Sequence, residues 1–162
     1  MDAPAEKAVV DLLTKQKQTL AVAESCTGGR IADRLTEVPG ASVVFRGGVV
    51  AYQDEVKERF LGVRAATLKS HGAVSEAVAR EMAEGARRVF ETDYAIATTG
   101  FAGPDGGPEA PVGTAFVAIA FAGGTNVAKE FNPTGRTAFK EQTARQALER
   151  LAAHLKNPSL PS

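Results

Sequence analysis

The sequence predicts an α/β fold, a three-layer α/β/α sandwich with a mixed sheet that includes a C-terminal antiparallel hairpin. Three observations predict it. Short apolar runs alternate with helical patterns over the first hundred residues, two apolar runs flank Gly123-Gly124-Thr125, and a long helical pattern follows them. A sheet connected in this way is expected to be covered by helices on both faces.

The composition fits one globular domain over residues 1–162, with 44% hydrophobic and 23% charged residues. Lys plus Arg and Asp plus Glu number 19 each, so no basic field favours nucleic acid or an anionic membrane as partner. A lone Cys26 and two histidines, His71 and His154, exclude an intrachain disulfide and argue against a metal site. We expect no cofactor. Because no apolar run approaches membrane length and no targeting pattern begins the chain, we expect a cytoplasmic protein.

The N-terminal half begins with a helix over Ala5–Gln16, where apolar residues recur at helical spacing. Strands and helices then alternate, and glycines or prolines end each helix. The predicted elements are a strand at Thr19–Ala23, a helix at Gly28–Glu37, a strand at Phe45–Tyr52 and a helix at Asp54–Leu61. Gly47-Gly48 indicates a bulge or close packing within the second strand.

The C-terminal half contains the clearest helix, Ser75–Glu91, with an apolar stripe and a capping Ser75. Four glycines and two prolines between Gly100 and Pro108 predict a loop. The other predicted elements are a strand at Asp93–Thr98, hairpin strands at Val112–Phe121 and Asn126–Phe131, a helix at Thr137–Leu155 and a frayed tail over Asn157–Ser162.

Polar residues follow three predicted strands, at Glu24–Gly29, Tyr52–Lys57 and Thr98–Gly107. In an open α/β sheet such strand ends converge on one crevice where ligands bind. Ser25 is expected to lie beside free backbone N–H groups at a helix start, which suits a phosphate or the oxyanion of an acyl transfer. Gly28 and Gly29, in the same junction, let a ligand approach the backbone.

No histidine lies near these junctions, which argues against a Ser-His-Asp arrangement. A serine nucleophile would need another base, and a desolvated lysine or a tyrosine beside a cation can serve. Each candidate also has a structural alternative. Ser25 can simply cap a helix, Lys57 can be a solvated surface lysine and Tyr52 a packed ring. Cys26 is a rival nucleophile or a small buried apolar residue.

Five motifs, in the same order, resemble the CinA C-terminal domain family. They are Ala23–Gly29, Phe45–Tyr52 with Lys57, Leu61–Val63, His71–Glu76, and Thr99–Gly107 with Pro111–Thr114. The resemblance runs from the first predicted helix to the last. It implies the activity of the family's nicotinamide-nucleotide amidases, which convert nicotinamide mononucleotide to nicotinate mononucleotide and ammonia without a metal. It also implies a homo-oligomer.

The resemblance further implies a role for each catalytic residue. Ser25 takes the place of the family's nucleophile, and Lys57 and Tyr52 take the places of its lysine and tyrosine. Ser25 would attack the amide carbon while Lys57, directly or through Tyr52, accepts the proton. Backbone N–H groups near Thr27–Gly29 would hold the oxyanion. Arg136 and the loop Gly103–Gly107 would suit the ribose phosphate. The expected substrate-binding residues are Glu24, Thr27, Gly28, Gly29, Thr99, Gly100, Gly103, Pro104, Gly106, Gly107 and Arg136.

The chain departs from the family pattern at two places. Gln53-Asp54 replaces the usual Ser-Asn after the tyrosine, and Ala110 stands where a lysine is common. Many members of the family carry an additional N-terminal nucleotide-binding domain associated with competence. The present sequence begins at the amidase-like part, so we expect it to be a stand-alone form. Two alternatives stay open, a non-catalytic nucleotide-binding or assembly module and a DNA-associated competence factor, although the balanced charge argues against the latter.

Overall fold

A computed structural model describes residues 2–158 of the chain. The helices are α1 (Ala5–Gln16), α2 (Arg30–Thr36), α3 (Asp54–Leu61), α4 (Ala65–His71), α5 (Glu76–Phe90) and α6 (Arg136–Lys156), with a short 3-10 helix, η1, at Ala41–Val43. The strands are β1 (Leu20–Glu24), β2 (Phe45–Val50), β3 (Tyr94–Gly100), β4 (Thr114–Phe121) and β5 (Gly124–Phe131). Most of the predicted frayed tail, residues 159–162, lies outside the described residues.

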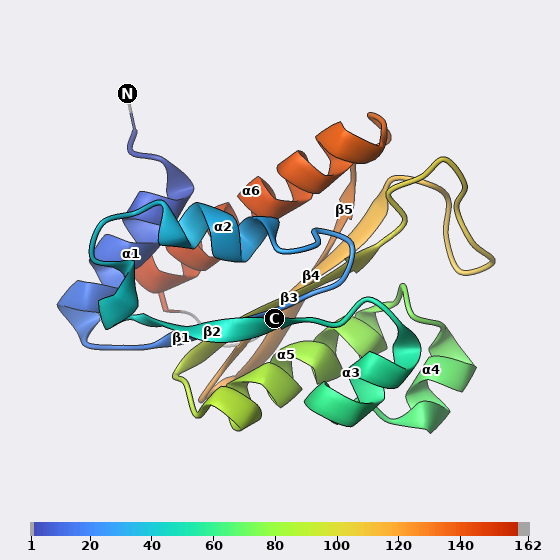
Figure 1. The fold of residues 1–162 in the computed structure, drawn as a ribbon, viewed down its shortest axis with the longest axis horizontal. Coiled ribbons are helices and arrows are strands. Elements are labelled where there is room, and N and C mark those ends of the chain that lie inside the picture. The colour runs from blue at the N-terminus through green and yellow to red at the C-terminus, as the bar shows by residue number, and fades with distance from the viewer. Residues whose placement is uncertain (1, 159–162) are drawn as a thin grey trace.

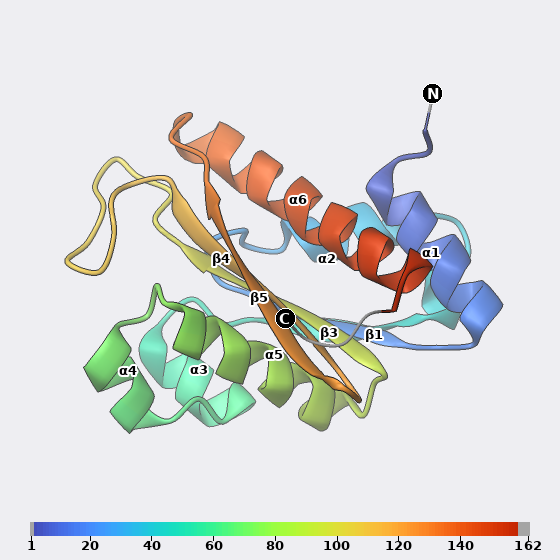
Figure 2. The same ribbon diagram turned by 180° about the vertical axis from the view of Figure 1, so that it is seen from behind.

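The five strands form one mixed sheet in the order β2-β1-β3-β4-β5 (Figures 1 and 2). β1 runs parallel to β2 and β3, whereas β4 is antiparallel to both β3 and β5. Glu24 pairs with Val50 on one side and Thr98 on the other, so β1 and β2 end at the same level and β3 continues for two more residues. The predicted mixed sheet with a C-terminal hairpin is confirmed.

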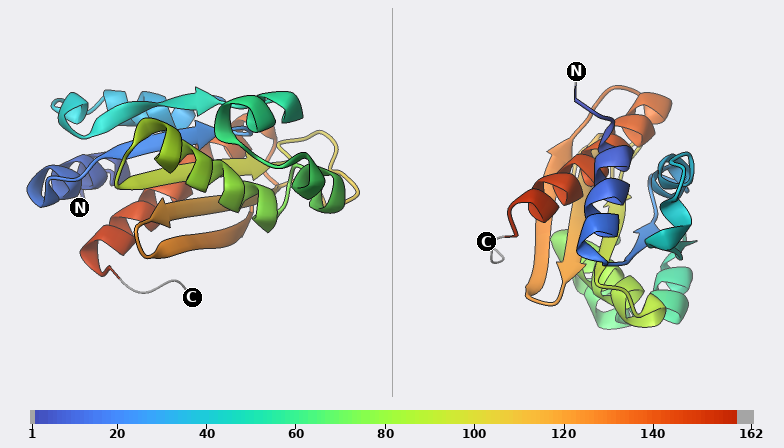
Figure 3. Two further views of the ribbon diagram at one scale, coloured as in Figure 1. Left: turned by 90° about the horizontal axis from the view of Figure 1, so that it is seen from below. Right: turned by 90° about the vertical axis from the view of Figure 1, so that its left-hand side faces the viewer.

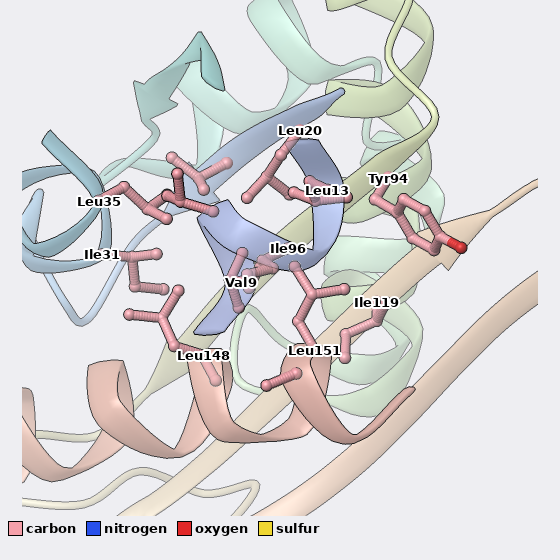
Figure 4. Close-up of a cluster of buried hydrophobic side chains, with 14 of the residues drawn as sticks. Val9, Leu13, Leu20, Ile31, Leu35, Tyr94, Ile96, Ile119, Leu148 and Leu151 are labelled. Atoms are coloured by element: carbon pink, nitrogen blue, oxygen red, sulfur yellow. The ribbon is translucent and has the colours of Figure 1, made fainter. Parts of the chain in front are cut away.

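Helices cover both faces of the sheet, as the end-on view shows (Figure 3). On one face α1, α2 and α6 bury the larger core, which includes Leu13, Ile31 and Leu148 (Figure 4). On the other face α3, α4 and α5 bury a second core around Leu61 and Met82. The structure therefore has the three-layer arrangement that the sequence predicts.

β2 lies very close to β1, and glycine makes this approach possible. A Cβ at Gly48 would lie 2.4 Å from Val22 Cγ2 and 2.6 Å from the Val22 carbonyl oxygen. The register between the strands also shifts between Leu20 and Ala21. Both the bulge and the close packing predicted from Gly47-Gly48 are thus present.

The sequence prediction misses α4 and misplaces several ends. α4 has only seven residues, AATLKSH, too few for an apolar stripe to repeat, although Gly72 supplies its C-cap. α2 begins at Arg30 rather than Gly28, because Gly28 and Gly29 adopt φ values of 61° and 104° in the turn before it. β5 begins at Gly124, so the hairpin turn is tighter than predicted.

Candidate active site

A cavity of about 230 Å³ opens where β1 and β3 end. Its lining residues come from four regions: the turn after β1, the segment from Tyr52 into α3, the residues after α4, and the loop after β3 with the start of α6. They are Ser25, Cys26, Tyr52, Lys57, Ala73, Val74, Thr99, Gly100, Phe101, Ala102, Gly103, Asp105 and Arg136. The fold thus brings together all three predicted catalytic residues.

Ser25 is the first residue after β1, and the sheet holds its backbone in place. Its amide donates to the Thr98 carbonyl at 3.0 Å, and its own carbonyl accepts from the Gly28 amide at 3.1 Å. The residue is 8% exposed. Its Oγ forms no hydrogen bond with the described residues, so the hydroxyl is available to a ligand in the cavity and is not used as a helix cap.

Glu24 occupies the helix start that the sequence predicts to be free. Its Oε1 accepts from the Ile31 amide and its Oε2 from the Ala32 amide, both at 3.0 Å. The Thr27 hydroxyl donates to Oε1 at 2.6 Å. Glu24 is buried and does not line the cavity. The carboxylate therefore caps α2, and the first turn of α2 offers no anion site.

The turn after Ser25 supplies fewer free amides than expected. Gly28 donates to the Ser25 carbonyl, which removes it from the predicted oxyanion donors. The amides of Cys26, Thr27 and Gly29 donate to no backbone carbonyl in the described chain. Of these three residues only Cys26 lines the cavity, so its N–H group is the remaining backbone candidate for stabilising an oxyanion near Ser25.

Lys57 lies on α3 and is 1% exposed, so the expectation of a solvated surface lysine is wrong. Its Nζ donates to the Tyr52 backbone carbonyl at 2.9 Å and lies 3.9 Å from Asp54 Oδ1. Burial lowers the pKa of Lys57, and the negative charge of Asp54 opposes that effect. A lysine with a lowered pKa can supply a neutral amine, the form that accepts a proton.

Tyr52 is not a packed ring but is 58% exposed. Its hydroxyl accepts a hydrogen bond of 2.8 Å from Arg136 Nη2, while Arg136 Nη1 donates to the Gly103 carbonyl at 2.7 Å. No hydrogen bond joins the Tyr52 hydroxyl to Ser25 or Lys57 in residues 2–158. Tyr52 thus contacts Lys57 through its carbonyl and contacts Arg136 through its hydroxyl.

The end of β3 and the loop after it hold the other predicted binding residues in unequal positions. Thr99, Gly100 and Gly103 line the cavity, and the Thr99 hydroxyl donates to the Ala73 carbonyl at 2.8 Å. Pro104 lines an adjoining cavity of about 340 Å³, which shares Gly103 and Arg136 with the first. Together the two cavities offer the few hundred Å³ typical of a small-molecule site, about 300–1,000 Å³.

Besides Glu24, five predicted binding residues lie outside both cavities: Thr27, Gly28, Gly29, Gly106 and Gly107. Gly107 is packed against Phe101, since a Cβ there would lie 2.3 Å from the ring. Thr27 is fully buried and contacts the Thr98 hydroxyl at 2.8 Å. Thr27 therefore lies outside the cavities because it packs within the turn, and Gly107 because it packs within the loop.

The prediction did not assign Ala73 and Val74 to the site, and it covered Phe101, Ala102 and Asp105 only as part of the junction Thr98–Gly107. Ala73 and Val74 fall in one of the motifs quoted above, His71–Glu76, which was the available signal. The rival nucleophile Cys26 also lines the cavity, but burial raises the pKa of its thiol to about 12. A thiol with this pKa is protonated near neutrality, so Ser25 is the better nucleophile candidate.

Residues 2–158 contain no group of three or more His, Cys, Asp and Glu side chains placed to hold a metal ion. No helix among these residues is both long and apolar enough to cross a membrane. The site is thus defined by a serine, a buried lysine and an arginine.

These features define an α/β domain with a serine–lysine cleft at the carboxyl ends of its parallel strands. The family model of the CinA C-terminal domain matches residues 2–155. The chain belongs to the CinA C-terminal domain family.

Relatives and solved structures agree with this assignment. A CinA-like protein of Gemmatimonas aurantiaca is 53% identical over 82% of this chain and 31% of its own length. One of Thermotoga maritima is 48% identical over 96% of this chain and 38% of its own length. The chain thus spans about a third of these curated relatives.

Among solved structures, competence damage-inducible protein A from Klebsiella pneumoniae superposes with a TM-score of 0.93 at 35% identity, covering 96% of this chain and 97% of that one. The competence/damage-inducible protein from Agrobacterium tumefaciens gives 0.86 at 38% identity, covering 97% and 98%. The similarity therefore extends over the whole fold.

Proposed function

We propose that this protein is a nicotinamide-nucleotide amidase, which hydrolyses the carboxamide of nicotinamide mononucleotide to nicotinate mononucleotide and ammonia. One observation carries the proposal: the buried Lys57, with its lowered pKa, shares a cavity with a serine whose hydroxyl has no partner in the described chain. A binding module has no need for a desolvated amine in the same cavity as a free hydroxyl. An amidase that lacks a catalytic histidine does need one.

In the proposed reaction, Ser25 Oγ attacks the carboxamide carbon and its proton passes to Lys57 Nζ. The developing oxyanion lies near the free backbone amide of Cys26. Lys57 then returns the proton to the leaving nitrogen, and ammonia departs as the C–N bond breaks. Water next attacks the resulting ester, again with Lys57 as the base, and nicotinate mononucleotide and free Ser25 are released.

The Tyr52 carbonyl gives Lys57 its orientation. A neutral amine donates one N–H to this carbonyl at 2.9 Å and keeps its lone pair for the proton of Ser25. The carbonyl accepts equally well from the protonated amine that forms during the attack. Lys57 is therefore held in one position through the proton transfer, and no relay through the Tyr52 hydroxyl is required.

Arg136 supplies the positive charge at the mouth of the cavity. Its guanidinium is bonded to two neutral oxygens, those of Tyr52 and Gly103, and to no carboxylate of the described chain. An arginine that is bonded only to neutral oxygens can bind the phosphate of a nucleotide as an additional partner. We propose this contact as the anchor of the ribose phosphate.

The test is to incubate the purified protein with nicotinamide mononucleotide and to measure ammonia and nicotinate mononucleotide. We expect equal amounts of both products from the wild type and none from Ser25→Ala. Tight binding of the nucleotide with no ammonia would contradict the proposal and support the non-catalytic nucleotide-binding module. A control with Ser70→Ala, an exposed serine of α4, should keep full activity.

A further inference from the structure

Lys140 reaches from α6 to the turn that follows Ser25. A Cβ built on Gly28 would lie 3.2 Å from Lys140 Nζ and 3.5 Å from its Cε. The Gly28 amide in turn donates to the Ser25 carbonyl. The ammonium group therefore lies beside the space that a side chain at Gly28 would fill, next to the turn that carries the candidate nucleophile.

Lys140 also stands one helical turn after Arg136, so the two side chains project from one face of α6. Residues four apart on a helix have Cβ atoms about 6 Å apart. Arg136 lines the cavity, and Lys140 lies beside Gly28, in the turn that follows Ser25. The two cations thus extend from the cavity lining toward the turn that carries the candidate nucleophile.

Neither cation has a carboxylate partner within residues 2–158. No salt bridge or hydrogen bond engages Lys140 Nζ, although the side chain is half-buried. The neighbouring Glu141 is instead bound by Arg30 and Arg34. The one acid in the cavity lining, Asp105, pairs with neither cation. Two positive charges, one helical turn apart and without a negative partner, are an arrangement that a dianionic group would neutralise.

A purely structural role explains Lys140 less well. A lysine that only covers apolar surface lays its methylene groups on that surface and keeps its ammonium in water. Here the ammonium itself lies against a glycine of the turn, where the missing side chain leaves room beside it. Partial burial of this charge costs solvation free energy, and no group in the described chain offsets that cost.

We propose that Lys140 and Arg136 together bind the phosphate dianion of the substrate, and that Lys140 thereby makes the enzyme select a nucleotide over the corresponding nucleoside. The inference rests on the proposed amidase function for the identity of the reaction. Lys140 is a specificity residue, because it contacts the phosphate and takes no part in the chemistry at the carboxamide.

The test compares nicotinamide mononucleotide with nicotinamide riboside, which lacks the phosphate. In Lys140→Met, we expect the KM for the nucleotide to rise about 10- to 100-fold, the range of a hydrogen bond to a charged group. The kcat/KM for the riboside should stay within about twofold of wild type, because only the phosphate contact is lost. Lys140→Arg should restore most of the affinity for the nucleotide. Arg145→Met, an exposed cation of the same helix paired with Glu149, is the matched control and should change neither value.

Calorimetric binding of nicotinamide mononucleotide to Ser25→Ala protein separates this inference from the proposed function. An unchanged nucleotide affinity in Lys140→Met, or an equal loss for the riboside, would overturn the role of Lys140 while the amidase proposal stands. Absence of ammonia release, with nucleotide binding still weakened by Lys140→Met, would overturn the amidase proposal and uphold the role of Lys140. No binding of the nucleotide at all would overturn both.

Discussion

Lys57 Nζ donates a hydrogen bond of 2.9 Å to the backbone carbonyl of Tyr52, five residues earlier in the chain. The carbonyl belongs to the segment that leads from β2 into α3, and the ammonium is almost completely buried beneath it. A backbone carbonyl is a neutral partner. It fixes the amine in position without adding the negative charge that would keep the amine protonated, so burial lowers the pKa of Lys57.

Substitution of Lys57 tests its role as the base. Lys57→Met keeps the length of the side chain and removes the amine, so we expect kcat/KM to fall at least about 100-fold. Lys57→Arg should lose nearly as much, because a guanidinium does not deprotonate near neutrality. Single-turnover rates at saturating substrate measure the effect, and Lys69→Met, an exposed lysine, is the control. Near-wild-type chemistry in the arginine variant would rule out Lys57 as the base.

Asp54→Asn is expected to shift the pH dependence of the reaction. The negative charge of Asp54, 3.9 Å from Nζ, raises the pKa of Lys57 against the effect of burial. Activity requires the neutral amine, so it rises with pH through that pKa. Removing the charge lowers the pKa, and the acidic limb of kcat/KM should move to lower pH.

Salt provides a second measure of the same interaction. The Asp54 side chain is 59% exposed, so ions screen it. The acidic limb of the wild type should therefore move toward that of Asp54→Asn as salt is raised, while the variant changes little. If the acidic limb of kcat/KM in Asp54→Asn moved to higher pH, this would contradict the assignment of Lys57 as the titrating base.

Cys26 is expected to be inert in the folded protein. Burial raises the pKa of its thiol to about 12, so the reactive thiolate is scarce near neutrality. Iodoacetamide should modify Cys26 in urea but not in buffer, as intact mass spectrometry would show. Cys26→Ala should keep at least half of the wild-type activity. Rapid alkylation of the native protein with parallel loss of activity would instead point to the thiol as nucleophile.

Glu24→Gln is expected to destabilise the fold by about 2 kcal/mol, the typical loss for a buried hydrogen bond to a charged group. The carboxylate accepts from the Ile31 and Ala32 amides, and a carboxamide can replace only one of its two oxygens as acceptor. Urea unfolding measures the change in the free energy of unfolding. Glu58→Gln on the exposed surface of α3 is the control and should stay within about 0.5 kcal/mol. Equal stability of the two variants would show that Glu24 is not a cap.

Much of this architecture follows from periodicity and turn residues. Five of the six helices in residues 2–158, and the strands of the central sheet, have strong local signals, such as the apolar stripe of α5 and the glycines around the hairpin. α4 lacks such a signal because it is short and its buried contacts, through Thr67 and Leu68, are few. The order of the strands depends on long-range pairing, which one sequence does not encode locally.

The site was predictable in its position but not in its contacts. Strand ends converge in any sheet of this kind, so Ser25, Tyr52 and Lys57 could be grouped from sequence. The burial of Lys57 had one overlooked signal, since it stands one turn before the fully buried Leu61. By contrast, the Arg136–Tyr52 bond joins residues 84 positions apart. The capping of α2 by Glu24 likewise depends on the exact path of the turn.

Trapping the acyl-enzyme tests the central claim, nucleophilic attack by Ser25 assisted by Lys57, most directly. Nicotinamide mononucleotide is mixed with wild-type protein, the reaction is quenched with acid within the first turnover, and peptides are mapped by mass spectrometry. We predict that the peptide containing Ser25 gains the mass of a nicotinate mononucleotide acyl group, in ester linkage to Oγ, and that Ser25→Ala protein gains none and releases no ammonia. An adduct on Cys26, or wild-type ammonia release from the Ser25→Ala protein, would contradict the account.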